Sequence, residues 1–458
     1  SQMYKSVRKS SYANVHERHK VPGTTFLVDA FTWQCNETSH WFLTHFHSDH
    51  YMGLDKSFNS GTIYCTASTS RLAQSKLQIP RSVIRDLHFN TREVIDDVLV
   101  TAIDANHCPG SAMLLFQHRD GTTILHCGDM RWSSRMNSIQ CLAPPAQIDY
   151  LYLDTTYCNK KHQFPDQDIV IDRIVEYCRP HFAENDVMFL IGTYSIGKER
   201  ILIRLAKEFR CRIHVSPQRY KDICMYGLPC NIPETFTTDG SASRIHVVPL
   251  GDISYQSLSQ LRDRMAAHGP RFKRTVALRP TGWSHSATRD ISIAQHDNIT
   301  IVNIAYSEHS SFTELRSCVD YLRPLKIVPT VNAKTAEERK KILDCFNEFQ
   351  DTSKDRSKIS SYFKKASPPS GRPSKKSAAP RWRAVPVFPT DKPFSSAMQG
   401  PHPGTIQSYF PPHAAKQEEL SFDLESVDIA EQHRFMAEIT LKRKRQPENG
   451  EFEGFPIR

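Results

Sequence analysis

Short apolar runs separated by turn residues dominate the first third of the 458-residue chain. Runs of this length, bounded by Gly, Pro, Asn and Asp, are typical of β-strands. They predict six strands, at residues 25–29, 41–44, 98–103, 112–116, 123–126 and 148–153. This part of the chain is therefore expected to be mostly β-sheet.

From about residue 166 the pattern changes, because apolar positions at helical spacing begin to alternate with short apolar runs. Asp166 can cap a helix whose apolar positions include Ile169 and Ile174, and Pro180 is expected to end it. The same pattern predicts strands at 187–191, 212–215, 274–278, 299–304 and 326–330, and helices at 199–209, 257–267, 312–322 and 336–349. The folded body is thus predicted to be an α/β protein.

This periodicity stops after Gln350, where Ser, Pro, Lys and Arg become the dominant residues. Such a composition predicts a disordered segment. Residues 351–392 hold 11 basic and 3 acidic side chains, a net charge of +8 compared with +10 for the whole chain, and such a basic cluster favours an acidic polymer or an import receptor as partner. The later basic run Lys442–Arg445 is interpreted either as a nuclear import signal or as a solvated charge cluster.

Composition excludes several protein classes. No run of about 18 apolar residues exists, and residues 1–20 are polar and basic without a hydrophobic segment, so neither a membrane span nor a secretory signal is expected. The 12 cysteines include no Cys-x-x-Cys pair, which indicates reduced thiols instead of a disulfide framework or a zinc knuckle. We therefore expect a soluble intracellular protein with no membrane partner.

One loop concentrates residues that bind metals. His45, His47, Asp49 and His50 lie within six residues, directly after the strand predicted at 41–44. Side chains two apart at a strand end point the same way, and the following turn can aim the other two at a neighbouring point. Core packing does not call for imidazoles at alternate positions of a loop, so the cluster predicts a site for two adjacent metal ions.

Two later segments extend this pattern. His107 lies in a loop after the strand predicted at 98–103, and Asp129 follows the strand predicted at 123–126. Strand-end ligands in the order His-x-His-x-Asp-His, His, Asp resemble those of the metallo-β-lactamase fold. The resemblance implies an αββα sandwich in which Asp29 supports the histidine loop from behind the metal ligands.

Further segments narrow the resemblance to one branch of that superfamily. DANHCPGS, YLDTTYC, GTYSIGKER, RPTGW and YSEHSS occur in this order. They resemble the β-CASP DNA crosslink-repair nucleases, the sensitive-to-nitrogen-mustard (Artemis- and Apollo-like) family, over about residues 21–335. The resemblance implies this organisation: a basic N-terminal extension at 1–20, the metallo-β-lactamase domain at 21–157 and 299–350, an inserted β-CASP α/β domain at 158–298, and a disordered basic tail at 351–458.

The resemblance also implies a ligand set. His45, His47, His107 and Asp129 are assigned to the first ion, and Asp49, His50, Asp129 and His309 to the second, with Asp129 bridging. The expected catalytic residues are Asp49, Asp129, Asp154 and His309, where Asp154 orients a ligand or relays a proton. Zn²⁺ is expected from the His-rich ligands, with Mg²⁺ or Mn²⁺ as alternatives at the second, more oxygen-rich position.

A phosphate seat is predicted near residue 198. Gly192 to Lys198 fit the G-x-x-x-x-G-K of a P-loop, but Glu199 replaces the hydroxyl residue that would hold Mg²⁺, so ATP binding is not expected. A helix N-terminus with a lysine nevertheless suits a phosphate. In the resembled family a 5′-phosphate sits in a pocket between the domains, and Thr155, Ser195 and Lys198 are candidates for it. The alternative is that Lys198 merely begins a solvated helix.

Together these features predict a nuclear, monomeric, metal-dependent DNA 5′-to-3′ exonuclease acting in interstrand crosslink or double-strand break repair. The alternatives are a structure-specific DNA endonuclease, an RNA-processing β-CASP nuclease and a small-molecule hydrolase of the same fold. Residues 326–332 lack the histidine of the RNA enzymes, which favours DNA over RNA. A catalytically inactive scaffold is disfavoured by the complete ligand set. In the tail, Ile359–Phe363 and Ile406–Phe410 share I-x-S-Y-F and resemble a sliding-clamp (PCNA) binding peptide without its leading Gln; an unspecified interaction motif is the alternative.

Overall fold

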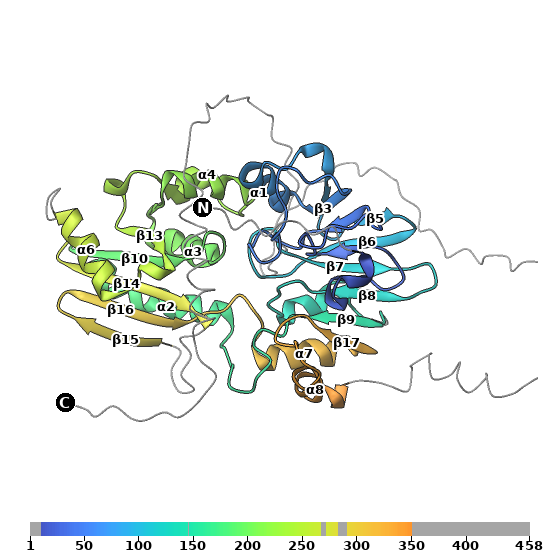
Figure 1. Cartoon of the computed structure of the whole chain (residues 1–458). Helices are drawn as coiled ribbons and strands as arrows, with labels where there is room; N and C mark the ends of the chain where they lie inside the picture. The colour runs from blue at the N-terminus through green and yellow to red at the C-terminus, as the bar shows by residue number, and fades with distance from the viewer. Residues whose placement is uncertain (1–10, 145, 267–271, 283–290, 350–458) are drawn as a thin grey trace, which may run out of the picture. The chain divides into compact units, whose positions relative to one another are not determined.

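The computed structural model describes residues 11–144, 146–266, 272–282 and 291–349 (Figure 1). All of them lie within the first of the two units into which the chain divides, Ser1–Ser370. The predicted clamp-binding repeats and the basic run Lys442–Arg445 fall outside the described residues. Among the described helices, none is long and apolar enough to span a membrane.

Two sheets form the sandwich that the sequence predicts. The first has the parallel order β1-β2-β3-β4, with β1 (Leu27–Val28), β2 (His40–Phe42), β3 (Thr62–Thr66) and β4 (Ile84–Leu87). The second has the order β17-β9-β8-β7-β6-β5, with β5 (Arg92–Ile95), β6 (Val98–Asp104), β7 (Ala112–Gln117), β8 (Thr123–His126), β9 (Tyr150–Leu153) and β17 (Lys326–Pro329). Pairing is antiparallel from β5 to β8 and parallel from β8 to β17.

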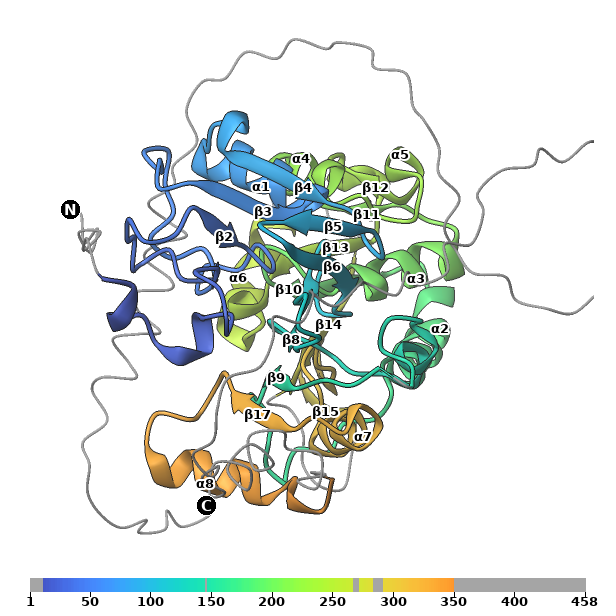
Figure 2. The ribbon, with the colours of Figure 1, turned by 90° about the vertical axis from the view of Figure 1, so that its right-hand side faces the viewer.

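Buried side chains from both sheets fill the space between them. Val28 and Phe42 of the first sheet share one apolar cluster with Leu114 and Phe116 of the second. Helix α1 (Ala67–Leu77) packs against β3 and β4, and α7 (Phe312–Leu322) and α8 (Ala336–Asp344) share a cluster with the second sheet. Figure 2 shows the orange β17 beside β9, although about 170 residues separate these two strands in the chain. The αββα order of the predicted fold is thus confirmed.

A third, seven-stranded sheet lies between β9 and β17 in the chain. Its order is β12-β11-β13-β10-β14-β16-β15, with β10 (Val187–Thr193), β11 (Ile213–His214), β12 (Phe236–Thr237), β13 (Ile245–Pro249), β14 (Arg274–Thr281), β15 (Ile291–His296) and β16 (Ile299–Ala305). Within the described part of this seven-stranded sheet, β15 pairs with β16 in the antiparallel direction and all other pairings are parallel. The connecting helices are α2 (Gln167–Ala183), α3 (Glu199–Phe209), α4 (Pro217–Met225), α5 (Ile232–Thr235) and α6 (Tyr255–Ala266). This is the predicted α/β insert.

Single-turn 3₁₀ helices complete the described elements: Tyr12–Asn14, Glu17–His19, Arg81–Val83, Ser134–Ser138, Gly240–Ala242, Leu250–Asp252 and Asn347–Phe349.

Three local expectations need correction. Helix α2 continues through Pro180 to Ala183, because a proline so near the C-terminal end removes only one late hydrogen bond. Ile169 is half exposed, since the buried face of α2 includes Val170 and Ile174. The strand predicted at 299–304 is β16, which pairs with β14 and β15 in the seven-stranded sheet, so the return to the sandwich begins after it.

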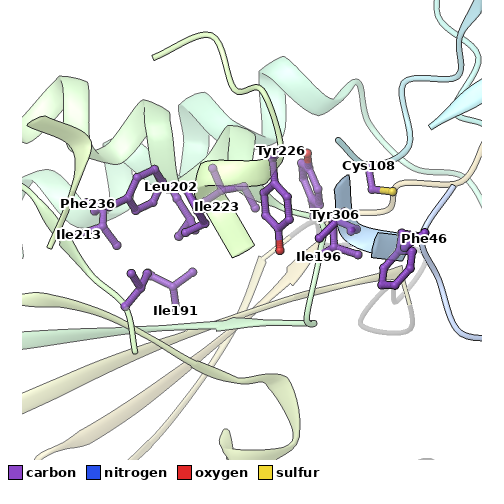
Figure 3. Packing of buried hydrophobic residues seen from close by; sticks show 14 of the residues in the cluster. Phe46, Cys108, Ile191, Ile196, Leu202, Ile213, Ile223, Tyr226, Phe236 and Tyr306 are labelled. Carbon is purple, nitrogen blue, oxygen red and sulfur yellow. The ribbon is translucent and has the colours of Figure 1, made fainter. Parts of the chain in front are cut away.

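One apolar cluster joins the insert to the loops that hold the predicted metal ligands. It contains Ile191 and Leu202 of the insert together with Phe46, between His45 and His47, and Cys108, next to His107 (Figure 3). Ile196 and Tyr306 belong to the same cluster and are almost fully buried. Because protein cores are close-packed, this contact restrains the metal-binding loops directly.

Candidate metal centre

The structure brings the predicted ligands together at the C-terminal ends of strands. His45 follows β2, His107 follows β6, Asp129 follows β8 and Asp154 follows β9 directly. His309 lies in the loop between β16 and α7. Side chains at one edge of a sandwich can converge on a common point without long loops, which is why the fold can assemble them from distant parts of the sequence.

Four donors form the first group: His45, His47, His107 and Asp129. His47 Nδ1 lies 2.9 Å from His45 Nε2 and 3.0 Å from His107 Nε2. Asp129 Oδ2 lies 3.7 Å from both of those Nε2 atoms. A tetrahedral ion with bonds of ~2.0–2.1 Å requires donor–donor distances of about 3.4 Å, so these donors fit a zinc-sized cation.

Each imidazole of this group uses its other nitrogen to bond an oxygen atom. His107 Nδ1 donates to the carbonyl of Glu308 at 2.8 Å, and His47 Nε2 donates to the carbonyl of Ile196 at 3.4 Å. His45 Nδ1 lies 3.0 Å from the Thr44 hydroxyl. Such partners orient a ligating imidazole and select its tautomer, leaving the inward nitrogen free to bind a metal.

The second group contains Asp129, Asp154 and His309. Asp154 is 1 % exposed, and its Oδ2 accepts from His309 Nδ1 at 2.8 Å and from the Met130 amide at 3.1 Å. His50 Nε2 lies 3.3 Å from Asp129 Oδ2. Asp49 and His50 belong to neither group. The Asp49 side chain is 71 % exposed, and its Oδ2 lies 3.7 Å from His50 Nε2. The carboxylate of Asp154 therefore lies closer to the second donor group than the carboxylate of Asp49 does.

Asp29 lies behind the histidine loop. Its backbone has φ 50°, and its carboxylate accepts from the Thr44 amide at 2.9 Å and the Thr44 hydroxyl at 2.7 Å. The same carboxylate lies 2.7 Å from His50 Nδ1. Asp29 thus holds both ends of the loop and orients the imidazole of His50, as a supporting carboxylate would.

The protonation states differ between the two groups. Burial lowers the pKa of His45 and His47, and lowers the pKa of His107 to about 4, so these imidazoles are neutral and ready to bind a metal. Burial acts the same way on His309, but Asp154 and then Asp129 outweigh it and raise its pKa to about 9. His50 likewise has a raised pKa, because Asp129 and Asp29 outweigh its burial. A cation that binds at the second position must therefore displace the protons that His309 and His50 otherwise hold.

The three residues predicted to bind a phosphate lie in different environments. Lys198 is 4 % exposed; its backbone has φ 68° at the N-terminus of α3, and its Nζ lies 3.7 Å from Glu308 Oε2. The Thr155 hydroxyl donates to the Val331 carbonyl, and Ser195 is exposed. Lys198 is therefore not the solvated helix start that the sequence left open.

Sequence reasoning missed Glu308, which links the insert to the metal centre. Its Oε1 accepts from the Lys198 amide at 2.5 Å, while its carbonyl accepts from His107. A Cβ at Gly197, which has φ 111°, would lie 2.6 Å from Glu308 Oε2, so only glycine permits this approach. Burial opposes its charge, but Lys198 and then His107 hold the pKa of Glu308 below its usual range. An acidic residue directly before a predicted ligand was the available signal.

The sandwich, the insert and the donor set define a hydrolase of the metallo-β-lactamase superfamily with a β-CASP domain. The family model described as DNA repair metallo-beta-lactamase matches residues 230–335. The DNA cross-link repair protein SNM1 of Arabidopsis thaliana is 38% identical over 361 residues, covering 76% of this chain and 74% of that protein. The chain therefore belongs to the SNM1/Apollo-type family of DNA cross-link repair metallo-β-lactamases, which confirms the predicted resemblance.

Other relatives are longer. The human DNA cross-link repair 1A protein is 38% identical over 337 residues, which cover 72% of this chain and 32% of that protein. The 5′ exonuclease Apollo of Danio rerio is 36% identical over 321 residues, covering 68% of this chain and 52% of that protein. The chain thus spans about a third to a half of the length of these two relatives.

Proposed function

We propose that this protein is a metal-dependent DNA 5′-to-3′ exonuclease that hydrolyses phosphodiester bonds during interstrand crosslink repair. The observation that carries the proposal is the pair of donor groups sharing Asp129, in a chain of the DNA cross-link repair family. Relatives in this family are named DNA cross-link repair proteins and 5′ exonuclease.

The donor chemistry supports the ions that we propose for the two groups. Three neutral imidazoles and one carboxylate suit Zn²⁺ at the first position. The second position, with Asp129, Asp154 and His309, is richer in oxygen and also suits Mg²⁺ or Mn²⁺. Two ions held by these donors would lower the pKa of a water toward ~7 and offset the negative charge of the phosphodiester. Asp129 then contributes to both positions, and Asp154 orients the His309 imidazole through Nδ1.

The 5′-phosphate is proposed to bind beside Lys198, with Ser195 and Thr155 as further contacts. The ammonium of Lys198 is buried, and its 3.7 Å separation from Glu308 Oε2 is longer than a hydrogen bond. A terminal phosphate offers this ammonium a stronger acceptor than the single carboxylate does.

Lys198→Gln is therefore expected to reduce the preference for a phosphorylated end about tenfold, the effect of losing one charged hydrogen bond of roughly 1.5 kcal/mol. The measurement is kcat/KM on 5′-phosphate and 5′-hydroxyl single-stranded DNA of the same sequence. Lys76→Gln is the matched control, because Lys76 also pairs with a carboxylate, that of Asp222. An unchanged preference would place the phosphate pocket elsewhere.

One experiment tests the function as a whole. Purified full-length protein is offered 5′-phosphorylated single-stranded DNA, its 5′-hydroxyl twin and RNA, each with and without a chelator. We expect stepwise release of nucleotides from the phosphorylated DNA end, lost with chelator and restored by Zn²⁺ or Mn²⁺. Cleavage of RNA alone, internal cleavage only, or activity untouched by the chelator would contradict the proposal.

We further propose that residues 351–458 bind the partner proteins. The protein is proposed to act as a monomer in the nucleus. Ile359–Phe363 and Ile406–Phe410 supply aromatic pairs that suit a sliding clamp, and Lys442–Arg445 suits an import receptor. Clamp capture from purified components, with Phe363→Ala and Phe410→Ala combined, tests the first assignment; equal binding by the double variant would reject it.

A further inference from the structure

Arg131 is a buried arginine two residues after Asp129. It is 1 % exposed, and all three guanidinium nitrogens have partners. Nη1 donates to the Ser307 carbonyl at 2.7 Å, and Nη2 donates to the Pro165 carbonyl at 2.7 Å. Nε and Nη2 donate to the Glu314 carboxylate at 3.1 and 2.9 Å. Four of the five guanidinium N–H donors thus have acceptors, and the Glu314 carboxylate balances the charge, as a buried arginine requires.

The backbone of Arg131 makes two more contacts. Its amide donates to the carbonyl of Ala105 at 3.0 Å, and its own carbonyl accepts from Asn106 Nδ2 at 3.0 Å. These residues directly precede His107. Ser307, which the side chain bonds, lies two residues before His309. One residue therefore contacts all three loops that supply His107, Asp129 and His309.

The same guanidinium also joins the two connections between the sandwich and the insert. Pro165 lies just before α2, on the way into the insert, and Ser307 lies just after β16, on the way back. Gln167 Nε2 donates to the same Ser307 carbonyl at 2.9 Å. Glu314 belongs to the first turn of α7, where it completes the capping box with Ser311. Movement of any of these segments would therefore break or lengthen a hydrogen bond of the Arg131 guanidinium.

We propose that Arg131 is the positioning residue that sets the second metal position by holding the loops of Asp129, His107 and His309 at one spacing. It is not among the donors of either group, so it acts through them. The first group also has His45 and His47, which belong to a different loop, and is expected to depend less on Arg131. Loss of an outer partner of metal ligands typically costs about tenfold or more in metal affinity. The proposal rests on the two-metal centre of the proposed function but does not depend on its DNA substrate.

The test uses the full chain and two arginine variants. Arg131→Lys keeps the charge but cannot reach Ser307, Pro165 and Glu314 together. Binding of Zn²⁺ and Mn²⁺ is measured by equilibrium dialysis with elemental analysis, alongside thermal unfolding of the metal-free protein. We expect the first equivalent to bind within about twofold of wild type and the second about tenfold more weakly. Arg135→Lys is the matched control, because the side chain of that arginine is 75 % exposed and forms its ion pair with Asp168, away from the metal donors.

A second variant separates positioning from folding. In Arg131→Ala, added guanidinium or methylguanidinium is expected to restore binding of the second equivalent, whereas ammonium is not. If Arg131→Lys fails to fold, Glu314→Gln supplies the test, because Gln preserves the capping box while removing the charge that holds the guanidinium. Both equivalents binding as in wild type, or both weakening equally, would overturn the proposal. Altered metal binding in a protein whose wild type cleaves no DNA would instead reject the proposed function alone.

Discussion

Replacing Asp129 by asparagine is expected to abolish turnover while leaving DNA binding largely intact. Asp129 belongs to both donor groups, and its Oδ2 lies 3.3 Å from His50 Nε2 and 3.7 Å from the Nε2 atoms of His45 and His107, so its charge would act at both proposed metal positions. Asparagine keeps the shape but removes the charge that balances two cations. Losing on the order of 4 kcal/mol of transition-state stabilisation corresponds to a roughly thousandfold fall in kcat.

Asp120→Asn is the matched control for this variant. Asp120 is exposed in the turn between β7 and β8, where its carboxylate accepts from the Thr122 amide at 2.8 Å. Single-turnover rates and metal content are measured for both variants, with DNA binding measured in parallel by fluorescence anisotropy. If Asp129→Asn retained two bound ions and near-normal turnover, Asp129 would not bridge the two positions.

The first donor group could be predicted from sequence because its residues are positioned by the local structure of the strand ends that carry them. His45 and His47 alternate at a strand end, and such residues point the same way whatever the rest of the fold does. His107 and Asp129 each follow a strong apolar run, so their place at the edge of a sheet also followed from the pattern. The structure then groups these four donors, with their nitrogen and oxygen atoms within 4.8 Å.

The second position depends on contacts that no local pattern encodes. Asp49 was placed in it because it stands between His47 and His50, yet the turn directs its side chain to solvent. Asp154 reaches His309 across 155 residues, and Glu308 reaches His107 across 201. These pairs depend on where the inserted sheet returns the chain, and β16 itself joined that sheet against expectation. Arg131 was missed for the same reason: two of its side-chain partners are backbone carbonyls, which no sequence pattern indicates, and the third, Glu314, lies 183 residues away in the chain.

Asp154→Asn is expected to lower kcat by about 10- to 100-fold, as changes to the carboxylate partner of a metal-site histidine typically do. The carboxylate of Asp154 is nearly filled with hydrogen bonds: Oδ1 accepts from the Thr156 amide at 3.0 Å and the Thr156 hydroxyl at 2.6 Å, while Oδ2 accepts from His309. Asparagine can still accept from His309 Nδ1 through its oxygen, so orientation is partly kept while the charge is lost.

Comparing Asp154→Asn with Asp154→Ala separates two roles of this carboxylate: orienting the His309 imidazole and binding the metal ion itself. If Asp154 mainly orients His309, the asparagine variant should keep the second metal ion and outperform the alanine variant in kcat. If Asp154 binds the ion itself, both variants should lose that ion to a similar extent in metal analysis. Asp149→Asn is the control, because Asp149 precedes β9 at its opposite end and bonds the Thr123 amide at 2.7 Å, away from the metal donors. Wild-type kcat in both Asp154 variants would remove this residue from the reaction altogether.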